Sequence, residues 1–348
     1  MKKPKVERGP KVKVRRLEEK LGIHGSPTCE LFFDDAPAKL IGERQRGLIT
    51  YVMSLMNGAR IGIASQSLGI AEAAFRLARN YAHSRRQFGG PIENLPAVRE
   101  LLVNMRTDIQ AARALTYHAT YCVDVELGMV RKLELDTTLA PEIAKQYKNE
   151  SRRLKRYNAM LTPMSKYWAS EMSMRVSNDS VAVLGGSGYM KDYAAERHLR
   201  DSRITTIYEG TSQLQVVAAV RGVMAGTANT LLDELLNRAW PTELTAAVQQ
   251  IRDGQKSLTQ CMDFIKAQNS TDYMDLYGRR LVDNAIFLIV AALFADHATA
   301  SATKKVVLER WLSVRMPELR MNHEAICSGS RLAINDFAAL AGPVPALD

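Results

Sequence analysis

The sequence predicts a mainly α-helical protein, and three observations lead to that class. Aromatic residues make up only 7% of the 348 residues, methionine reaches 15, and alanine and leucine are plentiful. This balance favours packed helices over β-sandwiches and barrels. Apolar residues reach 46%, which is enough to build a core and excludes disorder as the general state. The length corresponds to about two domains.

The N-terminal segment differs from the rest of the chain. Met1–Arg16 holds eight Lys and Arg residues against one Glu, so it carries +7 of the net charge of +10. We interpret residues 1–16 as a basic tail, because this charge excess belongs to the terminus and not to the fold. Cys29–Phe33 then has the residue types of a β-strand, but the sequence offers that strand no good partner.

Apolar residues recur at helical spacing through most of the chain after Gly47. We expect a long core helix over Gly47–Tyr81, a break at Gly89–Pro91 and a second helix over Leu95–Val125, which together form a helical hairpin. Gly128–Pro163 is more polar, and we interpret it as an insertion or a short exposed helix.

Two further helices are marked by their ends. Met164–Leu184 is expected to be helical and to stop at the glycine-rich run 185–188. Ser212–Gly222 is expected to form the next helix, opened by a capping box of Ser212 and Gln215.

Residues 226–348 are interpreted as a separate helical extension. The longest uncharged apolar run, Ala285–Ala295, has eleven residues, whereas a membrane span needs roughly twenty, so we expect no segment to cross a bilayer. The expected helices cover Leu231–Asn237, Glu243–Ala267, Met274–Ala295 and Lys304–Ala339, the last with a break at Pro317.

The common chemical motifs are missing from the sequence. The four cysteines lie far apart, with no Cys-x-x-Cys and no histidine at metal-ligand spacing. We therefore expect no metal site, no disulfide framework and a reducing, cytoplasmic setting. No Walker loop or dinucleotide fingerprint occurs, and Tyr189 takes the last position of an otherwise suggestive Gly-x-Ser-x-Gly pattern.

One carboxylate is a candidate for chemistry. Glu209 stands between Tyr208 and Gly210, just ahead of the helix expected at Ser212. The dipole of that helix favours the glutamate anion, whereas burial in an apolar cleft disfavours it, so the residues alone leave the direction of its pKa shift open. Glu209 is either a general base or a residue that only supports the start of the helix.

Four segments in one order, at plausible spacing, resemble the acyl-CoA dehydrogenase family: Leu21–Phe33, Arg85–Gly89, Leu184–Tyr189 and Ile204–Gln215. The resemblance implies an acyl-CoA dehydrogenase-like C-terminal helical bundle over 45–225, after a short remnant of the family's β-domain over 17–44. The helices over 226–348 are similar to the C-terminal extension of longer members. The family's N-terminal helical domain and most of its β-domain have no counterpart before Leu17.

The resemblance also implies a reaction. Glu209 matches the glutamate that removes the α-proton of an acyl-CoA thioester while hydride passes to FAD, which gives a trans-2-enoyl-CoA. Gly58 and Ala59 occupy the other position at which relatives carry the base. Ala182 stands where the family commonly has a glutamine, which puts one cofactor hydrogen bond in doubt. The implied cofactor-binding residues are Arg85, Gln87, Phe88, Gly185, Gly186, Thr211 and Gln213.

The resemblance implies partners as well. These are an acyl-CoA substrate, an electron-transfer flavoprotein or oxygen as electron acceptor, and either further copies of the chain or a polypeptide that supplies the N-terminal half. Arg85 and Gln87 are expected to hold the FAD pyrophosphate across a subunit interface.

Two other function classes remain open. The chain could be a non-catalytic helical oligomerisation module that keeps the family's assembly surfaces, since its glycine-bearing helix at 47–81 suits close packing without a cofactor. Nucleic-acid binding through the basic tail and Arg152–Arg156 is less favoured, because neither segment contains interleaved aromatic residues or a reading motif. We expect no nucleic-acid partner.

Overall fold

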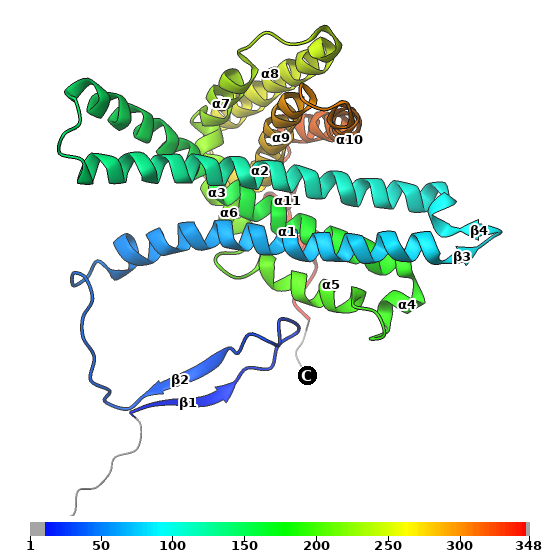
Figure 1. The fold of residues 1–348 in the computed structure, drawn as a ribbon, viewed down its shortest axis with the longest axis horizontal. Coiled ribbons are helices and arrows are strands. Elements are labelled where there is room, and N and C mark those ends of the chain that lie inside the picture. The colour runs from blue at the N-terminus through cyan, green and yellow to red at the C-terminus, as the bar shows by residue number, and fades with distance from the viewer. Residues whose placement is uncertain (1–10, 346–348) are drawn as a thin grey trace, which may run out of the picture.

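In the computed structural model, which describes residues 11–345, long helices stack into a body with a small β-hairpin at its N-terminal side (Figure 1). The strands are β1 (Val12–Leu17), β2 (Cys29–Phe33), β3 (Arg86–Gln87) and β4 (Gly90–Pro91). The helices are α1 (Met53–Ser84), α2 (Pro96–Leu135), α3 (Pro141–Leu184), α4 (Gly186–Tyr189), α5 (Ala195–Arg203), α6 (Ser212–Met224), α7 (Thr227–Leu236), α8 (Thr245–Ala267), α9 (Thr271–Ala298), α10 (Ala302–Cys327), α11 (Leu332–Asn335) and α12 (Phe337–Ala341).

The bundle is built on α1, α2 and α3, each of which packs against the other two. One face of α1 carries five fully buried alanines (Ala64, Ala71, Ala74, Ala78 and Ala82) at spacings of three, four or seven residues, so the neighbouring helices can approach α1 closely. The helical hairpin that the sequence predicts is confirmed. A six-residue π-helical turn over Gly47–Val52 precedes α1.

The interpretation of Gly128–Pro163 as an insertion or short helix is wrong. The helix α2 continues to Leu135, and α3 begins at Pro141 and runs unbroken through Pro163. Proline is favoured in a first helical turn. The helix continues through Pro163 because residues 160–170 are all buried, and their packing offsets the one lost hydrogen bond.

The N-terminal hairpin corrects a second expectation. The part of the predicted basic tail that the structure describes forms β1, which pairs antiparallel with β2, Val12 opposite Phe33 and Leu17 opposite Cys29. The other residues of that tail lie outside the described part. Arg15 and Arg16 each contact Glu30 of β2 at 3.3 Å, so basic residues that read as a solvated tail are strand residues with cross-strand partners.

A loop ties this hairpin to the helical body. The backbone N–H of Ile23 donates to Asp201 Oδ1 at 2.6 Å, and Arg200 donates to the Leu21 carbonyl at 2.9 Å. A Cβ on Gly22 would lie 2.6 Å from Asp201 Oδ1, so only glycine lets the loop approach α5 this closely. The motif beginning at Leu21 therefore positions the hairpin beside α5.

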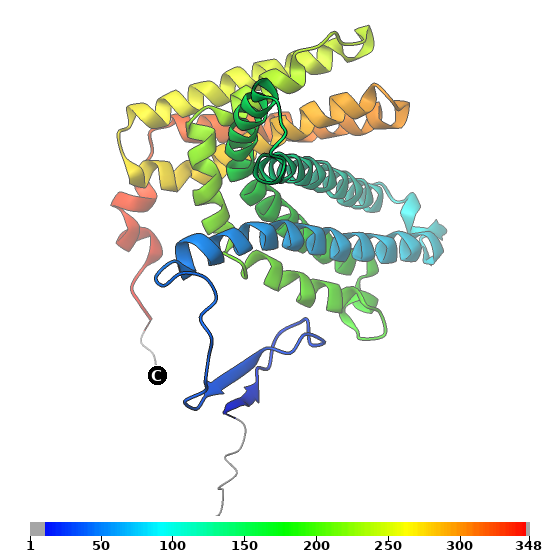
Figure 2. The same cartoon turned by 60° about the vertical axis from the view of Figure 1, so that its left-hand side comes forward.

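The C-terminal extension packs around α9, which contacts α2, α6, α7, α8 and α10 (Figure 2). Among the described helices, α9 has the length and composition of a membrane span, but 78% of its most apolar stretch is buried inside the protein. This burial is typical of a core helix. The break predicted at Pro317 is wrong, because α10 continues through it and ends at Cys327.

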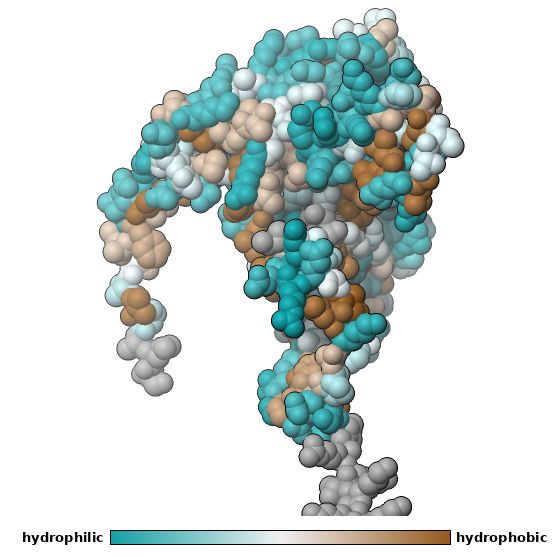
Figure 3. Space-filling model, turned by 90° about the vertical axis from the view of Figure 1, so that its left-hand side faces the viewer, coloured by the Kyte–Doolittle hydropathy of each residue, from teal (hydrophilic) through white to brown (hydrophobic). Residues whose placement is uncertain are grey.

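The last segment of the chain, α11 and α12, stands off from the helical body. Its apolar side chains are exposed, and Phe337 and Leu340 retain 66% and 67% of their accessible surface. Figure 3 shows this projection as an arm whose apolar and polar patches alternate down to the C-terminal end.

Candidate active site

Glu209 lies in a tight turn between α5 and α6. Both Glu209 and Gly210 adopt left-handed backbone conformations, with φ of 54° and 92°. A Cβ on Gly210 would lie 2.7 Å from Gln215 Nε2, so this position requires glycine on two grounds. A left-handed glutamate costs backbone energy and occurs where the surroundings hold it in place.

Two buried polar side chains hydrogen-bond this turn from the protein interior. Lys166 of α3 donates to the Gly210 carbonyl at 2.7 Å, and Gln215 Nε2 donates to the carbonyls of Glu209 and Gly210, both at 3.1 Å. Lys166 and Gln215 are fully buried. The turn carbonyls therefore have internal partners, and the backbone that carries Glu209 is clamped to α3 and α6.

The capping box predicted at Ser212 is wrong for the same reason. Gln215 points back to the turn carbonyls, and the N-cap is Thr211, whose hydroxyl accepts from the Leu214 N–H at 3.4 Å. Thr211 and Gln213 are both exposed, and they follow Glu209 by two and four residues.

Two cationic side chains, Arg60 and Lys166, lie near the half-buried Glu209 side chain. Burial lowers the pKa of Arg60 on α1, and the Glu209 charge opposes this effect. Burial, with the charge of Arg60, lowers the pKa of Lys166 to about 8, while Glu171 and Glu209 oppose it. The neighbouring Tyr208 hydroxyl hydrogen-bonds Gln66 of α1, which fixes this end of the turn to that helix.

Lys166→Met tests the buried clamp through pH dependence. The folded-state pKa of about 8 lies below the ordinary 10.5, so the unfolded chain binds more protons between these values and stability must rise with pH there. We expect Lys166 to add up to about 3 kcal/mol to the rise in unfolding free energy from pH 7 to pH 10. Urea unfolding should show a flatter pH profile for Lys166→Met. Identical profiles for both proteins would mean that Lys166 is not buried as a cation.

A second group of predicted residues lies at the C-terminal end of α1. A cavity of about 480 Å³ is lined by Arg85, Gln87, Gly185 and Gly186, together with Ala182, Ser187 and five apolar side chains and Tyr81. Gly185 is the C-cap of α3 with φ of 59°, and a Cβ on Gly185 or Gly186 would meet nothing within 4 Å. The structure thus brings four of the seven predicted cofactor residues to one open cavity.

Phe88 stands beside this group but not in it. The segment after α1, where the sequence predicts a break at Gly89–Pro91, is a tight β-hairpin in which β3 pairs with β4. Phe88 and Gly89 form its two-residue turn with φ of 54° and 88°, the geometry of a type I′ turn. Phe88 is 81% exposed, so a bulky residue in a left-handed conformation presents its ring outward.

The two groups are far apart within one chain. Tyr208 next to Glu209 contacts Gln66, and Arg85 follows 19 residues later at the end of α1. A helix rises 1.5 Å per residue, so about 29 Å separates these positions. The structure does not bring Glu209 together with Arg85, Gln87 and the paired glycines.

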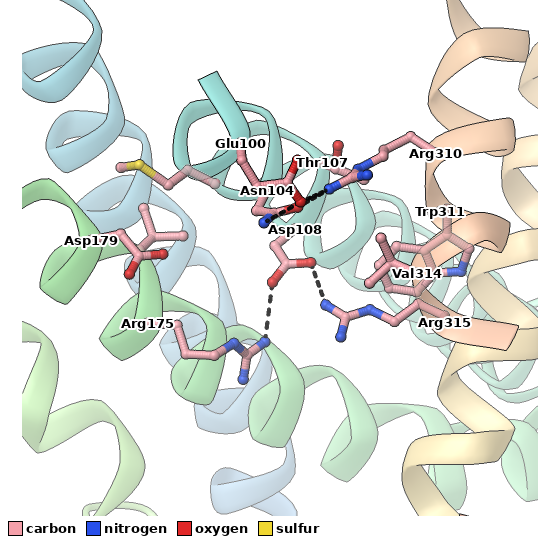
Figure 4. Close-up of a pocket in the computed structure, with 12 residues that line it drawn as sticks. Glu100, Asn104, Thr107, Asp108, Arg175, Asp179, Arg310, Trp311, Val314 and Arg315 are labelled. Carbon is pink, nitrogen blue, oxygen red and sulfur yellow. Dashed lines mark hydrogen bonds and ion pairs between the residues drawn. The ribbon is translucent and has the colours of Figure 1, made fainter. Parts of the chain in front are cut away.

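A charged pocket between α2, α3 and α10 is lined by none of the predicted catalytic or cofactor-binding residues. Figure 4 shows Asp108 between Arg175 and Arg315, at 3.4 and 2.6 Å. Arg310 hydrogen-bonds Asn104 at 2.8 Å and also pairs with Glu100. Because acidic and basic side chains neutralise each other across this pocket, it joins the extension to the bundle as a structural ion-pair network.

Sequence reasoning missed Lys166, Gln215 and Arg60. Lys166 sits in a stretch of α3 whose neighbours at helical spacing are all buried, and a lysine inside such a stretch is a usable sign of a buried functional group. The sequence pattern around Gln215 predicts a capping box in place of its contact with the turn, and Arg60 has no local pattern that distinguishes it from a surface arginine.

Comparison with known proteins fits this architecture. The family profile for the C-terminal domain of acyl-CoA dehydrogenases matches residues 46–224. The chain belongs to the acyl-CoA dehydrogenase family. The chain spans about half the length of the curated relatives it matches: it is 39% identical over 223 residues to an NADH-dependent acryloyl-CoA reductase of Anaerotignum propionicum, covering 63% of this chain and 49% of that protein. It is 37% identical over 217 residues to an acyl-CoA dehydrogenase of Bacillus subtilis, covering 62% and 49%.

Solved structures agree on the fold. Butyryl-CoA dehydrogenase from Megasphaera elsdenii is 33% identical, with a TM-score of 0.50 over 62% of this chain and 49% of that one. An acyl-CoA dehydrogenase from Bacillus anthracis, solved with FAD, is 24% identical and covers 97% of this chain and 61% of that chain with a TM-score of 0.72. The second similarity extends over the helical extension as well as the bundle. It concerns the fold alone.

Proposed function

We propose that this chain supplies the catalytic base and part of the flavin site of an FAD-dependent enzyme that dehydrogenates an acyl-CoA thioester to a trans-2-enoyl-CoA. The observation that carries the proposal is the clamped turn at Glu209. The backbone of Glu209, at the tip of this turn, is held in a left-handed conformation by Lys166 and Gln215. Strained backbone positions that the surrounding structure holds in place cluster at active sites.

Glu209 would take the proton from the carbon next to the thioester carbonyl. A carbon acid of this kind is too weak for a solvated carboxylate, so the base must be desolvated by a covering surface and aimed by its backbone. Lys166 and Gln215 fix the backbone that carries Glu209, and the Arg60 cation lies near its carboxylate. The backbone N–H of Glu209 is proposed to donate to the thioester oxygen, where negative charge develops.

The residues of the second group suit a flavin dinucleotide. FAD, when bound there, would supply the acceptor for the hydride that leaves the β-carbon of the acyl group. Arg85 is exposed and has no ion-pair partner among residues 11–345, so its guanidinium is available for a pyrophosphate. Gln87 adds an amide, and the bare glycine backbone at 185 and 186 leaves room for a ligand to approach. Ala182 lines the same cavity but offers no side-chain hydrogen bond.

The separation along α1 bears on assembly. Because Glu209 lies beside the first half of α1 and Arg85 follows its last residue, we propose that one flavin is held by residues of two copies of the chain, Thr211 and Gln213 of one copy and Arg85 and Gln87 of the other. The exposed Phe88 ring would lie in that interface. An electron-transfer flavoprotein is the proposed acceptor.

Flavin retention tests the proposal. The chain is purified alone and together with a polypeptide that supplies the family's N-terminal half, and the visible absorption of bound FAD is measured before and after addition of an acyl-CoA without oxygen. We expect bound flavin and its bleaching by acyl-CoA in the complete assembly. A colourless but stable oligomer under both conditions would favour the non-catalytic assembly module instead.

A further inference from the structure

A second chemical cluster lies in the C-terminal extension, outside the proposed active site. Cys261 of α8 and His323 and Cys327 of α10 place their ligand atoms within 4.8 Å of one another. Only part of this cluster is visible in the sequence, where His323 and Cys327 stand four residues apart. Cys261 lies 62 residues before His323, and its helix meets α10 only in the fold.

The two helices contribute matching pairs of side chains. Ser257 and Cys261 lie one turn apart on α8, and His323 and Cys327 lie one turn apart on α10. Residues four apart share a helix face, so each helix directs two polar side chains toward the other. The Ser257 hydroxyl lies 2.8 Å from His323 Nδ1, and Cys261 Sγ lies 3.4 Å from the same nitrogen.

These distances suit a tetrahedral ion. A zinc ion binds thiolate sulfur at about 2.3 Å and imidazole nitrogen at about 2.1 Å, so tetrahedral angles place the two ligand atoms roughly 3.6 Å apart. The Cys261–His323 separation of 3.4 Å is close to this value. Two thiolates and a neutral imidazole would also balance the charge of a divalent ion.

Burial is graded across the cluster. Cys261 is fully buried, whereas His323 and Cys327 are half-buried. An ion bound to Cys261 from the inside would therefore keep one coordination position toward solvent, where water can complete four ligands.

We propose that Cys261, His323 and Cys327 form a binding site for a thiolate-preferring divalent ion of the zinc type, which links α8 to the end of α10. As the ion binds, the two thiols release their protons to solvent and two metal–sulfur bonds form, with no change of oxidation state. The site would anchor the end of α10, from which the exposed arm of α11 and α12 departs.

The chain contains its own control. His118 and Cys122 on α2 have the same spacing as His323 and Cys327, and Cys122 Sγ lies 3.9 Å from His118 Nε2. Among the described residues, however, no third ligand joins that pair. A Cys122 variant therefore tests whether one buried cysteine beside one histidine is sufficient to bind the metal ion.

The full chain, reduced and stripped with a chelator, is titrated with zinc and separately with cobalt. We expect about one equivalent of either metal, a sulfur-to-cobalt charge-transfer band, and a rise in melting temperature with zinc. Cys261→Ser and Cys327→Ser should weaken zinc binding by roughly 100-fold or more, since even outer-shell changes cost 10- to 100-fold. Cys122→Ser should bind as the parent does.

Three results would overturn the proposal. The first is a reduced, folded parent protein that takes up no metal, whether or not mass spectrometry finds a Cys261–Cys327 disulfide before reduction. The second is undiminished metal uptake in Cys261→Ser, and the third is a loss of uptake in Cys122→Ser as large as that in Cys261→Ser. Circular dichroism establishes that each variant is folded, and Cys261→Ala replaces Cys261→Ser if the serine variant is not.

Discussion

Glu209→Gln is expected to abolish turnover while leaving flavin binding intact. The amide keeps the shape of the carboxylate but cannot accept the α-proton, and general base catalysis by a positioned side chain contributes about 10²- to 10⁴-fold. We therefore expect flavin bleaching by acyl-CoA to slow by at least about 10²-fold in the complete assembly. The Lys166 and Gln215 contacts reach the turn through backbone carbonyls, so the substitution should leave the turn in place.

The matched control for this variant is Glu243→Gln, which makes the same chemical change at an exposed position in the short turn before α8. It should behave as the parent in both flavin content and bleaching rate. A Glu209→Gln rate within tenfold of the parent would show that another group removes the proton. Loss of flavin from Glu209→Gln would instead assign this residue to cofactor binding.

Among the substitutions proposed here, Asp108→Asn is expected to lower the free energy of unfolding the most. Asp108 and Arg315 contact each other at 2.6 Å with side chains only 13% and 14% exposed. Arg315 also lies over the rings of Trp168, Phe287 and Trp311, so its charge has little access to water. Removing one partner of a buried ion pair costs 3–5 kcal/mol, because the other charge stays desolvated. Glu318 still contacts Arg315 at 2.7 Å, and we expect a loss of about 3 kcal/mol.

Urea unfolding measures this loss, and Asp253→Asn is the comparison. Asp253 pairs with Lys256 at 2.9 Å, but both side chains are mostly exposed, so removing this charge should leave the unfolding free energy almost unchanged. If the two variants lose the same amount, the pocket of Figure 4 is not a stabilising joint between the bundle and the extension.

Helical periodicity predicted α1 and the hairpin it forms with α2, because one face of each helix is apolar over many turns. It failed at Gly128–Pro163, where long polar side chains such as Arg152 and Arg156 cover the outer face of α3 and hide the buried positions between them. It also failed at β1, since the ion pairs and the strand partner that stabilise Arg15 and Arg16 are contributed by residues of β2. Local patterns do not contain such partners.

The candidate site was predictable only in part. The resemblance located Glu209 and the residues of the cavity at Arg85, but the buried lysine and glutamine under the turn depend on how α3 packs against α6. Likewise, Cys261 and His323 come together through tertiary packing. Side chains that act on a site from a distant helix carry little local signal.

The hairpin of β1 and β2 has a consequence for handling the protein. Val12, Val14, Leu31 and Phe33 retain 44%, 57%, 51% and 63% of their surface, and among the described residues each strand pairs only with the other. Two rows of amide and carbonyl groups are thus open at the ribbon's edges, next to an apolar face. Open strand edges of this kind can pair with further strands, either from a partner polypeptide or from other molecules in a concentrated solution.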